Sequence, residues 1–158
     1  SLIAASIGSR YARADRDLSL SMQYVMRGVD CDEDVTEMHF GGDVAPGGYA
    51  WIIPKGDGVA NVGLGLRTAF APRGAPLRQY LHRLVRVNPR TSRMFTRARV
   101  IGRVSATIPV GGPTKRTYGP GVMLAGDAAG HEMGYPSLPT GLHGTTRWVM
   151  YWSRPSEF

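Results

Sequence analysis

Apolar and polar side chains alternate along residues 18–27, which is the period of a half-buried β-strand. The even positions from Leu18 to Met26 are all apolar or aromatic, and the odd positions are mostly polar. An acidic turn over residues 30–34 follows, and residues 35–40 then have the composition of a second strand. This region therefore predicts two strands joined by a short polar connection.

A hairpin is the strongest local signal in the middle of the chain. The strand-like segments 49–53 and 59–66 flank Pro54-Lys55-Gly56-Asp57-Gly58, a sequence rich in turn formers. A further strand is expected over residues 99–107. Together with the first two, these segments predict an antiparallel sheet.

One segment within this block has helical spacing. Between Pro76 and Val87 the apolar side chains recur at i, i+4, i+7 and i+8, on one helical face: Leu77, Leu81, Leu84 and Val85. Pro76 suits the first turn of a helix, and Pro89 cannot continue one. The sequence therefore predicts a helix over residues 76–87, with its arginines on the other faces.

The order of these elements sets the expected fold class. Strands and a single helix occupy residues 18–107, and a strand followed by small turn residues comes only after Pro109. We therefore expect an α+β chain, in which an antiparallel sheet domain lies beside part of a nucleotide-binding α/β domain. The expected divisions are an end segment of the nucleotide-binding part over 1–16, the sheet domain over 17–107, and a returning segment over 108–158.

Composition narrows the classes of protein that fit. The chain has 158 residues, of which 42% are hydrophobic, and this is enough for a folded core. Cys31 is its single cysteine, which excludes an internal disulfide and a cysteine-based metal cluster, and the four histidines lack ligand spacing. No apolar run approaches the roughly 18 residues that span a bilayer, and no basic leader is visible. We expect no metal site and a cytoplasmic location.

The net charge of +7 comes from seventeen arginines and two lysines, set against the acidic residues, and it is unevenly spread. Nine arginines and no acidic residue lie between Arg73 and Arg103. Such a segment suits nucleic acid, an anionic membrane surface or a phosphorylated substrate, but a solvated helix face is the simpler interpretation. Nucleic acid is the least favoured partner, because no aromatic residues alternate with the arginines to stack on bases.

The run from Gly121 to Gly130 has a distinctive order. Residues 122–125 form an apolar strand that breaks at Gly126, presents Asp127 and continues through small residues. Backbone can approach a ligand closely at such a glycine, and the carboxylate can accept hydrogen bonds from a polyol. The run indicates a binding site for the sugar-like part of a cofactor. The alternative is an ordinary strand-to-helix turn with a capping Asp.

Two large aromatic side chains share one face of the strand expected over residues 49–53. Tyr49, Trp51 and Ile53 project to the same side, between Pro46 and Pro54 at the strand ends. They suit the wall of an apolar ligand channel, although the pattern alone is more typical of a plain core. Glycines interrupt the next strand, which leaves room for a ligand to lie against it.

Three motifs together resemble the geranylgeranyl reductase family of flavoproteins, most closely the archaeal enzymes that saturate isoprenoid chains of membrane lipids. They are PGGYAWIIPKGDGVANVGLGL at 46–66, IPVGGP at 108–113 and YGPGVMLAGDAAGH at 118–131. The resemblance covers much of residues 18–142. It implies an FAD-dependent reductase of the p-hydroxybenzoate hydroxylase type, with a cofactor domain and an antiparallel substrate domain. In such an enzyme reduced FAD delivers hydride to an isoprenoid C=C bond.

The resemblance also implies which residues meet each ligand. The family's PxxYxWxFP motif lines the isoprenoid cavity and matches Pro46, Tyr49, Trp51 and Pro54. Its phenylalanine is replaced here by Ile53. No catalytic residue is assigned, and an aromatic wall is a simpler role for Tyr49 than that of a proton source.

A second family motif concerns the cofactor. The family's GD motif, whose Asp contacts the ribityl chain of FAD, matches Gly126 and Asp127. A helix that begins near Pro139 would direct its positive end toward the flavin. The implied cofactor contacts are Gly126, Asp127, Ala128, Gly130, Pro139 and Thr140.

The chain departs from the family pattern at several places. No G-x-G-x-x-G phosphate-binding loop occurs, so the resemblance implies a fragment that lacks this N-terminal part and is inactive alone. Ser6 stands where the family has an Asp-Gly pair, and Pro136-Ser137 replaces a glycine cluster. Residues 144–158 match no familiar pattern.

Alternatives and partners stay open at this point. A flavin hydroxylase or monooxygenase of the same architecture is one alternative, and a non-catalytic lipid-binding module is another. The expected partners are an isoprenoid lipid substrate, an electron donor that is either NAD(P)H or ferredoxin, and a membrane contacted peripherally through the arginines. No nucleic acid is expected.

Overall fold

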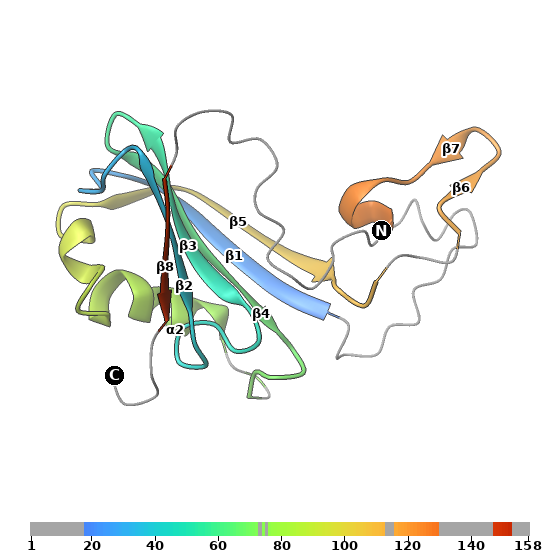
Figure 1. Ribbon diagram of the computed structural model, residues 1–158, viewed down its shortest axis with the longest axis horizontal. Helices are drawn as coiled ribbons and strands as arrows, with labels where there is room; N and C mark the ends of the chain where they lie inside the picture. The colour runs from blue at the N-terminus through green and yellow to red at the C-terminus, as the bar shows by residue number, and fades with distance from the viewer. Residues whose placement is uncertain (1–17, 73, 75, 113–115, 130–146, 153–158) are drawn as a thin grey trace.

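A six-stranded sheet forms the main body of the protein in a computed structural model, which describes residues 18–72, 74, 76–112, 116–129 and 147–152. The strands lie in the order β5-β1-β4-β3-β2-β8, and all neighbours are antiparallel except β2 and β8 (Figure 1). Their bounds are β1 Leu18–Arg27, β2 Val35–Phe40, β3 Tyr49–Gly56, β4 Val59–Arg67, β5 Arg99–Pro109 and β8 Arg147–Trp152. The sheet with few helices confirms the expected α+β class.

The predicted hairpin joins β3 and β4 at the centre of the sheet. Its turn consists of Asp57 and Gly58, and Asp57 has a positive φ of 54°. Two successive residues of positive φ match the right-handed twist of the flanking strands. The register that follows pairs Tyr49 with Gly65 and Trp51 with Gly63. Strand β1 then lies between β4 and β5.

Helical segments cover one face of the sheet (Figure 1). The helix expected over 76–87 is shorter than predicted: α2 spans Leu77–His82, and a π-helical turn, η2, continues over Arg83–Val87. A 3-10 turn, η3, follows at Ser92–Phe95. The predicted apolar stripe is correct, because it packs on the sheet, and the wider π turn keeps both Leu84 and Val85 buried.

The main core lies between these helical segments and the sheet. It consists of side chains from the even positions of β1, β3 and β4 together with the helical stripe and Phe95. The fully buried members include Ile52, Val62, Leu64, Leu66, Leu81 and Phe95. The alternation along these strands therefore sends one set of side chains to the helices and leaves the other set on the opposite face.

Two parts of the fold differ from expectation. Strand β8 was not predicted; it pairs in parallel with β2, from Val35 opposite Arg147 to Phe40 opposite Trp152. The strand predicted over 122–125 is shorter, since β7 spans only Val122–Met123 and pairs with β6, Tyr118–Gly119. An isolated two-stranded hairpin is only marginally stable, so its strands stay short. This hairpin lies beyond the end of β5, apart from the sheet (Figure 1).

No helix within the described ranges has the length and apolar character needed to cross a bilayer.

Candidate functional site

An aromatic row crosses the sheet face that lies opposite the helices. Tyr49 and Trp51 project from β3, and Phe40 is paired with Tyr49 across the β2–β3 ladder. The ring centroids are 6.0 Å apart for Phe40 and Tyr49, and 5.8 Å apart for Tyr49 and Trp51. All three side chains are half-buried. The predicted placement of Tyr49 and Trp51 on one face is therefore correct, and Phe40 extends the row.

Gly63 makes the position of the Trp51 ring possible. A Cβ atom at residue 63 would lie 2.5 Å from Cζ2 of Trp51 and 2.8 Å from Cβ of Gln23. The indole thus lies directly over the backbone of β4, where any other residue would displace it. Gly65 has more space in front of it within the described ranges, because a Cβ there would meet only the Ser19 hydroxyl oxygen, at 3.4 Å.

A chain of hydrogen bonds fixes the indole across three strands. Nε1 of Trp51 donates to Oδ1 of Asn61 at 3.0 Å, and Nδ2 of Asn61 donates to Oε1 of Gln23 at 3.2 Å. These are diagonal neighbours in the register of β3, β4 and β1, within reach of long side chains. The polar edge of Trp51 is therefore satisfied inside the sheet face, and its apolar ring face remains for packing.

The sequence analysis did not identify Asn61, Gln23 or Phe40 as site residues. Each is an ordinary strand residue whose neighbours become known only with the strand order and register. The sequence signal for Asn61 is that it is the single polar residue of the segment 59–66, because asparagine is disfavoured in strands.

The two prolines of the aromatic motif take different positions. Pro46 precedes β3 and is buried, and its carbonyl oxygen accepts a hydrogen bond from the backbone N–H of Arg67 at 3.0 Å. Pro54 was expected beyond the end of the strand, but β3 continues through it to Gly56. The register shifts between Pro54 and Gly56, and such an irregularity tolerates a residue without a backbone N–H.

The predicted cofactor segment is described only in part. Gly126 has a positive φ of 56° and begins a 3-10 turn, η4, over Gly126–Ala129. Among the described residues, a Cβ at residue 126 would meet no atom within 4 Å, so the described part of the chain leaves this backbone uncovered. The described backbone therefore fits a close approach by a polyol group. The side chain of Asp127, and residues Gly130, Pro139 and Thr140, lie outside what the structure describes.

Comparison with known proteins identifies the fold and its relatives. Residues 17–107 match the model of the geranylgeranyl reductase catalytic domain. The chain is 40% identical over 130 residues to a digeranylgeranylglycerophospholipid reductase of Methanothermobacter thermautotrophicus, covering 82% of this chain and 31% of the relative. It is 34% identical to a geranylgeranyl bacteriochlorophyll reductase-like protein of Thermoplasma acidophilum, whose crystal structure superposes with a TM-score of 0.63 over 77% of this chain and 30% of that one.

A more distant structural neighbour shares the fold alone. The structure of a flavin-dependent brominase superposes with a TM-score of 0.59 at 15% identity, over 80% of this chain and 33% of that one. The chain thus spans about a third of the length of the relatives it matches. The matched domain nevertheless covers more than half of the residues, including the whole aromatic row. The chain belongs to the geranylgeranyl reductase catalytic-domain family.

Proposed function

We propose that this chain forms the isoprenoid-facing part of a flavin-dependent reductase that saturates C=C bonds in geranylgeranyl chains of lipids. The observation that carries the proposal is the row of Phe40, Tyr49 and Trp51, which lies on the sheet face opposite the described helical segments and next to Gly65. The relatives named as digeranylgeranylglycerophospholipid reductases support the choice of substrate.

The proposed task of the aromatic row is to position an apolar chain and exclude water from it. An isolated C=C bond offers no charge or dipole to bind, so orientation must come from shape and apolar contact. Trp51 is suited to this because Asn61 fixes its orientation before a ligand arrives. Tyr49 serves as an aromatic wall, and Pro46, which precedes β3, is proposed to border the lining at the strand end. Pro54 was expected in the same lining, but it is paired with the core residue Ala60 and therefore lies on the face toward the helices.

The proposed cofactor is FAD, bound through Gly126, Asp127, Ala128, Gly130, Pro139 and Thr140. When bound, it supplies the hydride for the reduction. The open, positive-φ backbone at Gly126 supports a contact with the ribityl group. Replacement of Asp127 by alanine in a full-length protein should abolish flavin retention, measured by the visible absorbance of the purified protein. Wild-type flavin occupancy in that variant would contradict the assignment.

A chimera tests the activity itself. Residues 17–107 replace the matching segment of a full-length family member, and the anaerobic, chemically reduced protein is incubated with a geranylgeranyl lipid. Mass spectrometry should show the gain of two hydrogen atoms for each bond saturated. A matched chimera with Trp51→Ala should retain flavin and lose most of the reduction, since the positioned wall is gone.

The same chimera separates the alternatives. Oxygenated product from reduced protein and air, without saturated product under anaerobic conditions, would assign a hydroxylase instead. A chimera that retains flavin and reduces no lipid would contradict the proposal. We also propose peripheral contact with a membrane through the arginines of residues 73–103, because a lipid substrate must be reached at a bilayer surface.

A further inference from the structure

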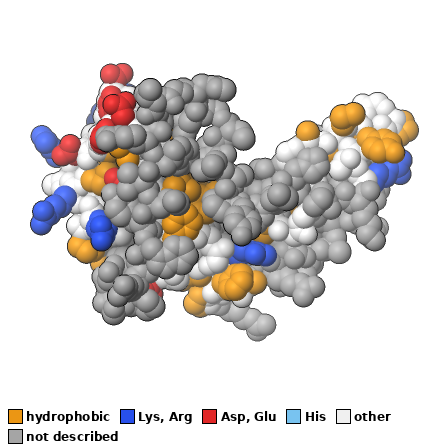
Figure 2. Space-filling model, in the orientation of Figure 1, with side chains coloured by type: hydrophobic (Ala, Val, Ile, Leu, Met, Phe, Trp, Pro, Cys, Tyr) orange, Lys and Arg blue, Asp and Glu red, His pale blue; other side chains and the backbone are white. Residues whose placement is uncertain are grey.

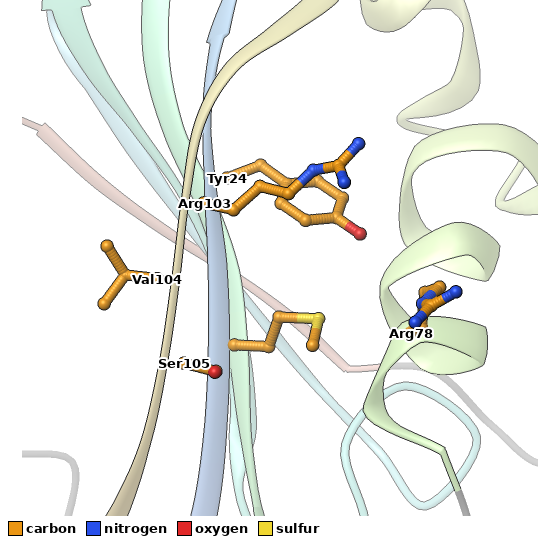
Figure 3. Close-up of a pocket in the computed structure, with 6 residues that line it drawn as sticks. Tyr24, Arg78, Arg103, Val104 and Ser105 are labelled. Carbon is orange, nitrogen blue, oxygen red and sulfur yellow. The ribbon is translucent and has the colours of Figure 1, made fainter.

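A groove lies on the helical side of the sheet, away from the aromatic row. Its inner part has a volume of about 340 Å³ and lies between α2 and the edge formed by β1 and β5. The lining residues are Met22, Tyr24, Arg78, Arg103, Val104 and Ser105. Figure 3 shows Arg103 and Tyr24 projecting from the strands toward α2, which carries Arg78 on the opposite wall.

Positive charge dominates this inner part. Arg78 and Arg103 come from separate elements to the same hollow, and within the described residues neither forms an ion pair with a carboxylate. The guanidinium carbon of Arg103 lies 5.5 Å from the centroid of the Tyr24 ring, which orients it. Two guanidinium groups and the Ser105 hydroxyl therefore line a hollow suited to an oxyanion such as a phosphate.

An apolar hollow of about 930 Å³ continues from the charged one and shares Met22 and Arg78 with it. Its apolar wall consists of Met22, Pro76, Leu77 and Val87, and the polar residues around it are Arg78, Gln79, His82 and Arg83. Val87 is 54% exposed at the apolar wall of the groove. Charged and apolar surfaces side by side fit an amphiphile better than a free ion or a nucleic acid.

The chain segment that contributes to the groove is rich in positive charge. Figure 2 shows Lys and Arg side chains on the side of the molecule that carries the helical segments, with Asp and Glu side chains gathered toward the upper end of that side. Residues 73–103 contain nine arginines and no acidic residue, so nothing in that segment offsets the groove. An anionic bilayer is the complementary partner, because it presents phosphates above apolar chains.

We propose that this groove docks the protein on a membrane by taking the phosphate of an anionic phospholipid between Arg78 and Arg103, with apolar contact from Met22, Leu77 and Val87. This site deepens the membrane contact of the proposed function and places it on the sheet face opposite the aromatic row. The test uses no flavin and no isoprenoid, so its failure is distinguishable from failure of the reductase activity.

The experiment measures flotation of the purified chain with vesicles of phosphatidylglycerol and phosphatidylcholine. Removal of each groove arginine should weaken binding about fivefold, so the double variant Arg78→Gln/Arg103→Gln should bind at least tenfold more weakly. Val87→Asn should weaken binding without changing the charge. Circular dichroism checks that the variants fold, which is expected because all three side chains are exposed.

A matched control removes the same charge elsewhere. The double variant Arg86→Gln/Arg93→Gln changes two exposed arginines that do not line either hollow, and should lose at most about twofold. If the two double variants lose vesicle binding equally, binding depends on diffuse electrostatic attraction and the proposed site is wrong. Equal binding to pure phosphatidylcholine vesicles would also overturn it. Displacement by inorganic phosphate alone would assign the groove to a free anion and overturn membrane docking.

Discussion

The two faces of one sheet use polar groups in opposite ways. On the aromatic face, Trp51, Asn61 and Gln23 form a chain of hydrogen bonds within the sheet. On the helical face, Arg78 and Arg103 bring two like charges to one hollow without a described carboxylate beside them. The polar groups of the first face have partners within the protein, and we propose that an anion supplies the partner on the second.

This difference teaches what each face can recognise. A side chain whose hydrogen bonds are already made gains nothing from a polar ligand and offers shape and apolar contact. Two guanidinium groups that line one hollow offer several N–H donors, and an oxyanion can accept hydrogen bonds from both. The aromatic face is therefore suited to an uncharged hydrocarbon chain, and the groove to a phosphate.

The largest effect is expected from breaking the aromatic face at its tightest contact. In Gly63→Ala the new Cβ must displace the Trp51 ring or the Gln23 side chain, because it would lie 2.5 and 2.8 Å from them. Overpacking of this kind costs about 1–3 kcal/mol in the free energy of unfolding, measured with urea.

The same substitution at a neighbouring glycine is the matched control. In Gly65→Ala the nearest atom is the Ser19 hydroxyl oxygen at 3.4 Å, so the free energy of unfolding should change by no more than about 0.5 kcal/mol. Equal losses at residues 63 and 65 would show that the close approach of Trp51 to β4 has no energetic consequence.

A smaller effect is expected from opening the hydrogen-bond chain. Asn61→Leu removes the acceptor for the Trp51 N–H and the donor to Gln23, and should cost about 1 kcal/mol of unfolding free energy. A double-mutant cycle with Trp51→Phe isolates the Trp51–Asn61 hydrogen bond. Fully additive losses would mean that Asn61 does not hold the indole.

The smallest effect is expected on the reactivity of Cys31, which has acidic side chains around it, in contrast to the arginine groove. Burial first, and then the carboxylates of Glu33, Glu37, Asp30 and Asp32, raise the pKa of the Cys31 thiol. The folded protein therefore keeps the thiol protonated to higher pH than the unfolded chain. In mildly alkaline buffer, iodoacetamide should alkylate native Cys31 more slowly than urea-unfolded Cys31.

The raised pKa of Cys31 also predicts how the stability of the protein depends on pH. The contribution of Cys31 to stability is complete below the ordinary thiol pKa and is lost as pH rises through the raised pKa of the folded state. Cys31→Ser should lack this loss. Equal alkylation rates in the native and unfolded protein would contradict the shift in pKa.

Local sequence patterns were enough to predict β1 to β5, the hairpin and the shared face of Tyr49 and Trp51, but they did not predict β8. Alternation along 18–27 and the turn formers around Asp57 depend on local backbone preferences, which operate before any long-range contact forms. Tyr49 and Trp51 share a face for the same local reason, since successive strand side chains point to opposite sides. The family motifs are also contiguous stretches, so no tertiary information is needed to find them.

The contacts between strands could not be predicted from local patterns. The bond from Trp51 to Asn61, the approach of Trp51 to Gly63 and the joining of β8 to β2 all depend on strand order and register, which no local pattern specifies. The groove likewise exists because α2 packs on β1 and β4 while β5 lies beside β1, which brings Arg78 and Arg103 to the same hollow. Both sites are non-local in the same sense: their residues are visible in the sequence, but their contacts are fixed by packing.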